Sequence, residues 1–411
     1  MPTNLTGEQL DAQVELLTFG CEYGDPQLAA AMRTRLWDRL AGAADQDRPL
    51  RVYAGYDPTA PDLHLGHSIT LRAMRRFQQL GHHVIVVVGT MTAMVGDTSD
   101  RATGRPRKTA DEVAAAAGSY AEQVFTILDR DRTEVVANGD WLASLTTSDL
   151  LEAASVFTVQ QFLARDNYRR RIDRGEPVGL HEFFYALLQG YDAVHLRADV
   201  QLGATEQLFN ILAGARLQEA LGQPPCAALT YPILVGIDGT HRMSKSRGNY
   251  VGLAEPPAEQ FGKTMSIPDR AMPSWAALVT DWPADEAARF LAGLADGALH
   301  PMEAKKQLAH RIVELYHGTD AADTAQSDFE RTFQHGRQPA TLPETVLPGP
   351  VGLIDLLVLV GAASSRSAAR RLIEGGGVSL DNERASFAER VVDHSATVQV
   401  GPRRFYRVII A

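Results

Sequence analysis

Two short apolar segments on either side of a helix-like segment restrict the fold of this chain more than any other feature. Residues 51–55 read Arg-Val-Tyr-Ala-Gly and residues 84–88 read Val-Ile-Val-Val-Val, which is the pattern of short buried strands. Residues 66–80 between them have the apolar spacing of a helix. A strand, a helix and a second strand within about 40 residues predict a parallel βαβ unit, whose ligands bind beyond the carboxyl ends of the strands.

The whole chain is expected to form several domains, because 411 residues exceed the size of one ordinary core. Alternating helix and strand signals predict an α/β fold with a Rossmann-like parallel sheet, and helix signals alone predict an α-helical domain after it. A segment with four prolines and two glycines then predicts an extended linker. The predicted parts are an N-terminal helical segment (1–50), the Rossmann-like domain (51–253), the helical domain (254–335), the linker (336–350) and a last small α/β domain (351–411).

Composition excludes several classes of protein. Hydrophobic residues make up 45% and charged residues 22% of the chain, as in folded globular proteins and unlike disordered ones. No run of about 18 apolar residues occurs, so we expect no membrane-spanning segment, and the first residues lack the pattern of a secretory signal. Only Cys21 and Cys226 are present, too few for a disulfide framework or a zinc site. We therefore expect a cytoplasmic protein.

The distribution of charge predicts contact with RNA over a limited surface. The net charge of −10 argues against a protein that coats nucleic acid nonspecifically. Residues 351–411 nevertheless contain 8 arginines against 6 acidic residues, whereas the preceding 350 residues contain 32 basic and 44 acidic residues. An acidic body with a locally basic C-terminal part suits a protein that meets RNA at limited patches.

The residues at the start of the first long helix form a candidate phosphate site. His64-Leu65-Gly66-His67 follows the first predicted strand. Two histidines three residues apart can both donate hydrogen bonds to an anion, together with the free N–H groups of the helix end. Gly66 has no side chain, so a flat group such as adenine can lie against the backbone. For this motif alone, a turn with two surface histidines is the alternative interpretation.

A second motif, Arg242-Met243-Ser244-Lys245-Ser246, lies far downstream in a loop rich in Gly, Ser and Lys. Lys245 supplies a mobile point charge, which suits a pyrophosphate that gains negative charge as its bond breaks. Taken alone, such a run of residues is usually a solvated loop. Together and in this order, the two motifs resemble the signatures of class I aminoacyl-tRNA synthetases.

Three further segments are similar to the bacterial tyrosyl branch of that family. They are residues 53–64 (Tyr-Ala-Gly-Tyr-Asp-Pro-Thr-Ala-Pro-Asp-Leu-His), 89–99 (Gly-Thr-Met-Thr-Ala-Met-Val-Gly-Asp-Thr-Ser) and 184–192 (Phe-Tyr-Ala-Leu-Leu-Gln-Gly-Tyr-Asp). In the last segment, Tyr185, Gln189 and Asp192 stand at i, i+4 and i+7, so a helix directs their polar groups to one side. A hydrogen-bonded polar stripe within a helix is the alternative interpretation of that spacing.

The resemblance to bacterial tyrosyl-tRNA synthetases implies tyrosine–tRNA ligase activity. Such an enzyme activates L-tyrosine with ATP to tyrosyl-adenylate and then transfers tyrosine to tRNA(Tyr). The residues that the resemblance assigns to tyrosine are Tyr53 and Asp192 at the hydroxyl, Asp97, Tyr185 and Gln189 at the ammonium, and Gln207 near the carboxylate. Phenylalanine would leave a buried carboxylate and phenol unpaired, which an apolar pocket could not penalise in the same way.

The resemblance also implies a nucleotide site. Its residues are His64, His67, Thr59 and Lys245 at the phosphates, Asp57, Gly66 and Glu206 at the nucleoside, and Arg101 and Arg105 on a loop near pyrophosphate. A solvated basic loop is the alternative interpretation of the two arginines. No protein nucleophile is required, because the tyrosine carboxylate attacks ATP directly and the protein contributes positioning and charge stabilisation. We expect Mg²⁺ to accompany ATP, without a protein metal site or a permanently bound cofactor. A homodimer is expected as well.

One segment departs from the family pattern. Where relatives of this kind usually read Gly-Gly-Ser/Thr-Asp-Gln, this chain reads Gly203-Ala204-Thr205-Glu206-Gln207. The resemblance places the family's aspartate on the ATP ribose, so we expect Glu206 to accept a hydrogen bond from a ribose hydroxyl. A carboxylate that only stabilises the start of the following helix is the alternative.

The C-terminal part resembles an S4 RNA-binding domain. Residues 365–381 read Ser-Arg-Ser-Ala-Ala-Arg-Arg-Leu-Ile-Glu-Gly-Gly-Gly-Val-Ser-Leu-Asp, a basic helix followed by a glycine turn and a strand. Arg366, Arg370 and Arg371 occupy adjacent turns of that helix and are predicted to contact RNA phosphates.

Two other functions remain open at the level of the sequence. A paralogous synthetase for a modified tyrosine, in a resistance or biosynthetic pathway, would share every motif above. An RNA-binding or splicing factor could keep the scaffold without catalysis, but the intact His64, His67 and Lys245 argue against that interpretation.

Overall fold

The computed structural model describes residues 5–58, 62–97, 118, 120, 122–333, 342, 344–381, 383–385, 387–401 and 404–410. The chain forms two compact units. The first consists of residues 1–256 and 263–308, and the second of residues 257–262 and 309–411. Among the described residues, no helix combines the length and the apolar character needed to cross a membrane.

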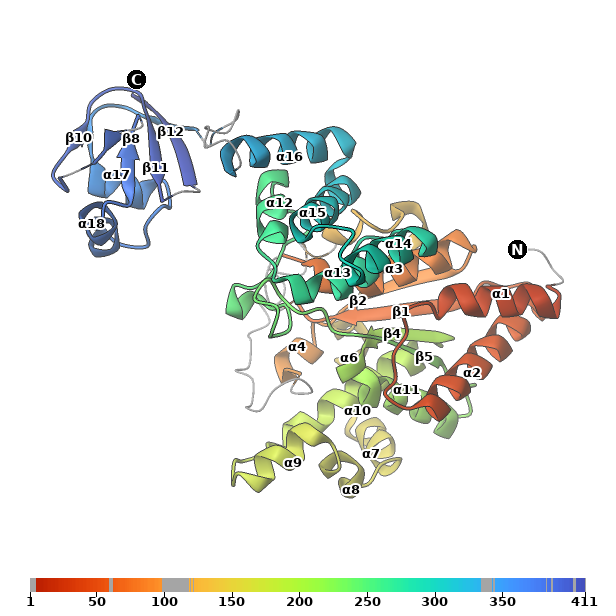
Figure 1. Ribbon diagram of the computed structural model, residues 1–411. Coiled ribbons are helices and arrows are strands. Elements are labelled where there is room, and N and C mark those ends of the chain that lie inside the picture. The colour runs from red at the N-terminus through yellow and green to blue at the C-terminus, as the bar shows by residue number, and fades with distance from the viewer. Residues whose placement is uncertain are drawn as a thin grey trace. The chain divides into compact units, whose positions relative to one another are not determined.

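A five-stranded parallel sheet lies at the centre of the first unit (Figure 1). Its strands are β1 (Arg51–Tyr56), β2 (His83–Val88), β3 (Thr133–Ala137), β4 (Val200–Ala204) and β5 (Ala227–Tyr231), in the order β3-β2-β1-β4-β5. This arrangement confirms the predicted Rossmann-like parallel sheet. The strand order reverses between β1 and β4, and ligands of such sheets bind in the crevice at the carboxyl ends of the strands at this point.

Helices pack on the sheet from two sides, with α3 on one side and α10 and α11 on the other (Figure 1). The helices that follow the N-terminal pair in this part of the chain are α3 (Leu65–Gln79), α4 (Thr92–Val95), α6 (Gly139–Leu142), α7 (Thr147–Ser155), α8 (Val159–Leu163), α9 (Asp166–Asp173), α10 (Leu180–His195) and α11 (Leu208–Ala220). The predicted βαβ unit is therefore present as β1, α3 and β2. The strands β4 and β5 were not individually predicted.

Two helices precede the sheet, as the apolar spacing of the N-terminal residues predicts. They are α1 (Gly7–Leu17) and α2 (Pro26–Asp45). Thr6 and Gln9 form a reciprocal capping box at the start of α1. Asp25 accepts hydrogen bonds from two backbone N–H groups at the start of α2, where Pro26 already has the backbone angle of a helix.

The carboxylate of Asp199 connects the N-terminal segment to the sheet. Its side chain is almost fully buried, just before β4. Arg48 donates two hydrogen bonds to its carboxylate oxygens, at 2.7 and 3.0 Å, and the backbone N–H of Arg51 donates a third at 2.8 Å. Arg39 of α2 lies 3.3 Å from the same carboxylate. A single buried acid therefore holds groups from α2, β1 and the chain between them.

Helices alone form the described chain between residues 257 and 333, as predicted from the loss of strand signals. They are α12 (Pro257–Met265), α13 (Met272–Val279), α14 (Ala284–Ala295), α15 (Pro301–His317) and α16 (Thr319–Phe333), with one turn of 3₁₀ helix at Asp269–Ala271. Within the first unit, Trp275 of α13 donates from its indole nitrogen to the carbonyl of Val235 at 3.1 Å.

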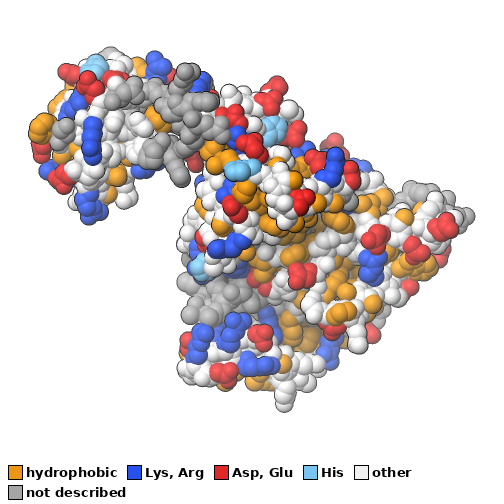
Figure 2. Space-filling view, viewed as in Figure 1, with side chains coloured by type: hydrophobic (Ala, Val, Ile, Leu, Met, Phe, Trp, Pro, Cys, Tyr) orange, Lys and Arg blue, Asp and Glu red, His pale blue; other side chains and the backbone are white. Residues whose placement is uncertain are grey.

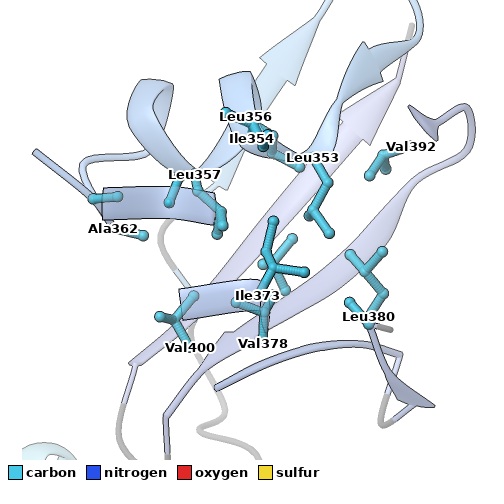
Figure 3. Close-up of a cluster of buried hydrophobic side chains, with 14 of the residues drawn as sticks. Leu353, Ile354, Leu356, Leu357, Ala362, Ile373, Val378, Leu380, Val392 and Val400 are labelled. Atoms are coloured by element: carbon cyan, nitrogen blue, oxygen red, sulfur yellow. The ribbon is translucent and has the colours of Figure 1, made fainter. Parts of the chain in front are cut away.

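A small mixed sheet forms the C-terminal part of the second unit. Its strand order is β6-β12-β11-β8-β9. The elements are β6 (Glu344–Leu347), β7 (Val351–Gly352), α17 (Leu353–Leu359), α18 (Arg366–Glu374), β8 (Val378–Leu380), β9 (Glu383–Arg384), β10 (Val391–Val392), β11 (Ala396–Val400) and β12 (Arg404–Ile410). Buried side chains of α17, α18 and the strands, such as Leu357, Ile373 and Val378, pack into one core (Figure 3).

The predicted linker is shorter than its composition suggested. Residues 344–347 were assigned to the linker of residues 336–350, but they form β6, which pairs in parallel with β12. The backbone pairing explains the difference, because prolines that flank a short edge strand do not prevent it from forming a ladder. The small domain therefore includes residues before 351.

Replacing Asp199 should test its role at the base of the sheet. Asp199→Asn removes the charge that faces Arg39 and Arg48, so we expect the free energy of unfolding to fall by about 3 kcal/mol. Urea unfolding followed by circular dichroism measures the change. Glu15→Gln is a matched control, because the Glu15–Arg33 pair is exposed and its loss should cost less than about 1 kcal/mol. Equal effects of the two substitutions would contradict the assignment.

Candidate active site

A cavity of about 840 Å³ lies at the carboxyl ends of β1 and β4. Its walls come from the residues after β1 and β2, the start of α3, one side of α10, the end of β4 and residues 242–246. The predicted site residues that line it are Asp57, His64, Gly66, His67, Asp97, Tyr185, Gln189, Asp192, Glu206, Gln207 and Lys245. Thr59, Arg101 and Arg105 lie outside the described residues.

A buried carboxylate lines the cavity. Asp192 of α10 is 3% exposed. The indole nitrogen of Trp141 donates to one carboxylate oxygen at 2.9 Å, and the side-chain amide of Asn138 donates to the other at 3.2 Å. Burial raises the pKa of Asp192 to about 8, the two hydrogen bonds act in the opposite direction, and the nearby Asp57 raises it further. A ligand group that donates a hydrogen bond here would stabilise the ionised form.

The two donors to Asp192 were not identified from the sequence. Asn138 directly follows β3, and Trp141 lies in α6 just beyond it. The sequence did contain one signal for them: both follow a predicted strand, and the carboxyl ends of parallel strands meet at the ligand crevice. The rings of Trp141 and His195 are stacked 4.5 Å apart, which fixes the plane of the indole.

Tyr53 lies behind the wall of the cavity rather than on its surface. Its side chain is 1% exposed and packs in a cluster that includes Leu188 and Trp141. Its hydroxyl donates to the backbone carbonyl of Gln189 at 3.5 Å, a long hydrogen bond. The structure therefore places Tyr53 near α10. Unlike Asp192, Tyr53 does not line the cavity. Its assignment to the substrate hydroxyl stays a prediction.

A second carboxylate, that of Asp57, sits where the chain leaves β1. Tyr185 donates to one of its oxygens at 3.0 Å and Thr92 to the other at 2.7 Å. The amide of Asn138 also donates to the hydroxyl of Thr92 at 3.1 Å, so hydrogen bonds connect Asp57 to Asp192. Gly89 is needed beside this network, because a Cβ there would lie 2.1 Å from the Asp57 carboxylate.

Further acceptor groups line the same cavity. Asp97 accepts a hydrogen bond from the side-chain amide of Gln207 at 2.6 Å. The side-chain oxygen of Gln189 is buried and has no hydrogen-bond partner within the described structure. A carboxylate and a buried amide oxygen on one cavity wall suit a ligand with several N–H donors, such as an ammonium group.

The two predicted phosphate histidines lie side by side at the start of α3, with ring centres 3.9 Å apart and ring planes tilted by 35°. Nδ1 of His64 accepts from the backbone N–H of Gly66 at 3.2 Å, and Nδ1 of His67 accepts from the backbone N–H of His64 at 3.1 Å. Because Nδ1 is an acceptor in both rings, the neutral rings carry their protons on Nε2. Both histidines can therefore donate from Nε2.

These imidazoles are neutral at physiological pH. Burial lowers the pKa of His67 to about 3, with a further lowering by the positive charge of Lys245. Burial also lowers the pKa of His64 well below its usual value, and His67 and Lys245 act in the same direction. The site therefore offers two neutral N–H donors beside the cation of Lys245.

The first N–H groups of α3 are engaged within the protein. The N–H of Leu65 donates to the carbonyl of Val251 at 3.0 Å, and those of Gly66 and His67 donate to His64. The expectation that the helix end offers free N–H groups to an anion is therefore wrong. A Cβ at Gly66 would lie 3.0 Å from the His64 ring, so glycine also keeps that imidazole in place.

A short loop carries the predicted lysine to the cavity. Lys245 begins a 3₁₀ turn (Lys245–Arg247), and its ammonium lies 5.7 Å from the centre of the Tyr120 ring. Asn249 holds the loop from within, because its side chain accepts from the N–H of Ser244 at 2.8 Å and donates to the carbonyl of Arg242 at 3.1 Å.

The predicted RNA-binding arginines share the outer side of α18 in the second unit. Arg366, Arg370 and Arg371 are exposed, whereas Ala369 and Ile373 of the same helix are buried in the core. Arg366 pairs with Asp355 at 2.9 Å and Arg370 with Glu389 at 3.2 Å. Exposed ion pairs are worth at most about 1 kcal/mol, so these arginines can exchange their carboxylates for phosphates.

Comparison with other proteins agrees with this geometry. Residues 45–334 match the family described as tRNA synthetases class I (W and Y), and residues 351–398 match the S4 domain. The tyrosine–tRNA ligase of Moorella thermoacetica is 45% identical over 88% of this chain and 88% of its own length. That of Desulfotalea psychrophila is 41% identical over 98% of this chain and 99% of its own length.

Solved structures give the same fold. The chain is similar to the tyrosyl-tRNA synthetase of Archaeoglobus fulgidus complexed with L-tyrosine, with a TM-score of 0.59 and 21% identity over 77% of this chain and 99% of that one. A C-terminally truncated mitochondrial tyrosyl-tRNA synthetase of Aspergillus nidulans gives a TM-score of 0.60 and 21% identity over 79% of this chain and 94% of that one. The chain belongs to the class I tRNA synthetase family that comprises the W and Y enzymes, and it carries an S4 domain after the family's catalytic region.

Proposed function

We propose that this chain is a tyrosine–tRNA ligase, which activates L-tyrosine with ATP and transfers the tyrosyl group to tRNA(Tyr). One observation carries the proposal: a single cavity is lined both by the buried, hydrogen-bonded Asp192 and by the neutral His64 and His67 with Lys245. Asp192 suits a phenol hydroxyl, and the two histidines with Lys245 suit a triphosphate.

The reaction needs positioning and charge stabilisation rather than a protein nucleophile. The carboxylate of tyrosine attacks the α-phosphorus of ATP, a bond forms to that phosphorus, and pyrophosphate leaves with the electrons of the broken bond. In the second step, a ribose hydroxyl at the 3′ end of tRNA attacks the tyrosyl carbonyl, and AMP leaves. His64 and His67 donate from Nε2 to phosphate oxygens, and Lys245 balances the charge that gathers on pyrophosphate.

Tyrosine would lie along the wall made by α10. Asp192 would accept a hydrogen bond from the phenol hydroxyl. Asp97 and the side-chain oxygen of Gln189 would accept hydrogen bonds from the ammonium. The hydroxyl of Tyr185 donates to Asp57, and we expect the Tyr185 side chain to border the ammonium group as well. The relatives that are 41–45% identical are tyrosine–tRNA ligases, which favours tyrosine over a modified analogue as the substrate.

Mg²⁺ would enter with ATP. The phosphate end offers imidazole N–H donors and an ammonium group, which bind anions and not metal ions. In the described part of the chain, no group of three His, Cys, Asp or Glu side chains is placed to hold a metal. The ion would therefore be held by phosphate oxygens and water, and would offset phosphate charge.

The S4 domain is proposed to bind tRNA through α18. Its three exposed arginines lie on one side of the helix, where they can follow a phosphate backbone. In the first unit, basic side chains also gather over α9 (Figure 2), where Arg169, Arg170 and Arg174 are exposed. Both surfaces suit a polyanion, although the whole chain has a net charge of −10.

A homodimer is proposed from an apolar surface on the first unit. Large apolar side chains are exposed on the consecutive helices α7 to α10, namely Leu151 (67%), Val159 (59%), Ile172 (48%) and Leu180 (73%). Four such side chains on helices that follow one another along the chain favour an interface in this part of the molecule, whereas single exposed apolar residues need no explanation. A second copy of the chain is the proposed partner, because a two-fold axis would let the surface cover itself.

A cytoplasmic location is also proposed. Both Cys21 and Cys226 are free thiols, and Cys226 is buried. Free buried thiols suit a reducing compartment, and so do the proposed substrates ATP and tRNA.

Pyrophosphate exchange should test the amino-acid specificity. With ATP and labelled pyrophosphate, we expect exchange with tyrosine and far less with phenylalanine. Trp141→Phe removes one donor to Asp192, so the ratio of kcat/KM for tyrosine to that for phenylalanine should fall about 2- to 10-fold. Trp37→Phe, in α2 and outside the cavity, is the control and should leave the ratio unchanged. Exchange that is equal for both amino acids in the wild type would overturn the proposed substrate.

Removing the charges of α18 should impair the transfer of tyrosine to tRNA without affecting the activation of tyrosine. With Arg366, Arg370 and Arg371 all changed to Gln, we expect KM for tRNA in aminoacylation to rise about 10- to 100-fold and its salt dependence to weaken. Pyrophosphate exchange should be unchanged, because no residue of the cavity is altered. Arg289→Gln, an exposed arginine of α14, is the control. Normal charging by the triple variant would show that α18 does not hold tRNA.

A charge on the apolar surface should prevent dimer formation. Leu180→Asp puts one carboxylate from each copy into the proposed interface, so the dimer Kd should rise about 100-fold or more. Analytical ultracentrifugation of the full chain measures the mass. Leu359→Asp, at an exposed apolar position of α17, should leave the mass unchanged. A monomeric wild type, or a Leu180→Asp variant that remains dimeric, would contradict this assignment.

A further inference from the structure

Glu206, which departs from the family pattern at residues 203–207, forms an ion pair with the loop that carries Lys245. Glu206, in the 3₁₀ turn Thr205–Gln207, points to Arg242 at the start of the loop of residues 242–249. One guanidinium nitrogen of Arg242 lies 3.1 Å from one carboxylate oxygen of Glu206 and 3.3 Å from the other. Both side chains line the cavity.

The ion pair is partly shielded from water. The side chains of Arg242 and Glu206 are 29% and 22% exposed. Burial lowers the pKa of Arg242, while the negative charge of Asp97 acts in the opposite direction. A half-buried guanidinium therefore needs a nearby carboxylate, and such pairs are stronger than fully exposed ones.

Arg242 is a fixed point of the loop backbone. It forms an isolated antiparallel bridge with Val235, and the next N–H, of Met243, donates to the carbonyl of Leu234 at 2.8 Å. The carbonyl of Arg242 accepts from Asn249, which closes the loop from its other end. Lys245 lies between these two anchors, so the position of Arg242 limits where the ammonium of Lys245 can go.

We infer that Glu206 is a positioning residue, which acts through Arg242 to hold the 242–249 loop and thereby Lys245 at the phosphate end of the cavity. The inference rests on the proposed function for the identity of the phosphate ligand. It replaces the expectation that Glu206 binds the ribose of ATP. An aspartate at position 206 would keep the charge but is one methylene shorter, so on the same backbone its carboxylate would lie farther from Arg242.

Two substitutions at position 206 distinguish this role from ribose binding. Glu206→Gln keeps the length and loses the charge, whereas Glu206→Asp keeps the charge and loses the length. If Glu206 positions the loop, both should lower kcat for pyrophosphate exchange about 5- to 20-fold, with KM for tyrosine changed less than about 2-fold. If Glu206 binds the ribose, Glu206→Asp should retain the wild-type kcat and KM for ATP, and that result would overturn the inference.

A deoxynucleotide gives an independent measure of ribose contact. Replacing ATP by 2′-deoxy-ATP and by 3′-deoxy-ATP should reduce kcat/KM by the same factor in the wild type and in Glu206→Gln. A smaller loss in the variant would mean that the carboxylate reads a ribose hydroxyl, and the inference would fail. In a double-mutant cycle, Glu206→Gln and Arg242→Gln together should be no worse than either alone.

Hydrogen exchange of the free, full-length protein tests the loop without catalysis. In Glu206→Gln and Arg242→Gln, the amides of residues 242–249 should exchange about 5-fold faster than in the wild type. Glu255→Gln is the matched control, because the Glu255–Lys263 pair has similar exposure and lies outside the loop. Unchanged exchange in the loop would overturn the inference whatever the substrate. A wild type with no tyrosine-dependent exchange of pyrophosphate would instead count against the proposed function.

Discussion

The active site depends on one buried carboxylate and on the groups that stabilise it. Burial raises the pKa of Asp192 to about 8, so its ionised form needs the donors that Trp141 and Asn138 supply. Asp192 belongs to α10, whereas both donors follow β3. The pairing of β3 with β2 and the packing of α10 bring these residues together. The surroundings of Asp192 therefore depend on the parallel sheet.

Hydrogen bonds extend from this carboxylate to a second one. Asn138 donates to both Asp192 and Thr92, Thr92 donates to Asp57, and Tyr185 closes the network at Asp57. Such a network fixes several side chains at once, because the loss of one member leaves its neighbours with unmet hydrogen-bonding groups. The loop that carries Lys245 has its own anchors, at Arg242 and Asn249.

Features that depend on a short stretch of sequence could be predicted. The βαβ unit followed from apolar runs, and the two histidines followed from a short motif at a strand–helix junction. Contacts between distant segments could not be predicted in this way. The position of Asn138 and Trp141 after a predicted strand hinted at the ligand crevice, but nothing local paired them with Asp192, and nothing local paired Glu206 with Arg242. The strand β6 was mistaken for linker because its partner, β12, lies at the other end of the small domain. The buried position of Tyr53 was likewise invisible to motif comparison.

The lining of the cavity provides partners for both proposed substrates. Asp97 and the side-chain oxygen of Gln189 suit the ammonium of tyrosine, and Asp192 suits its hydroxyl. Neutral imidazoles and Lys245 line the same cavity and suit the phosphates of ATP. With both proposed substrates held by these side chains, the tyrosine carboxylate and the α-phosphate would be the groups left to react. Binding in one cavity would then replace a bimolecular encounter by a reaction between two positioned groups, without a protein nucleophile.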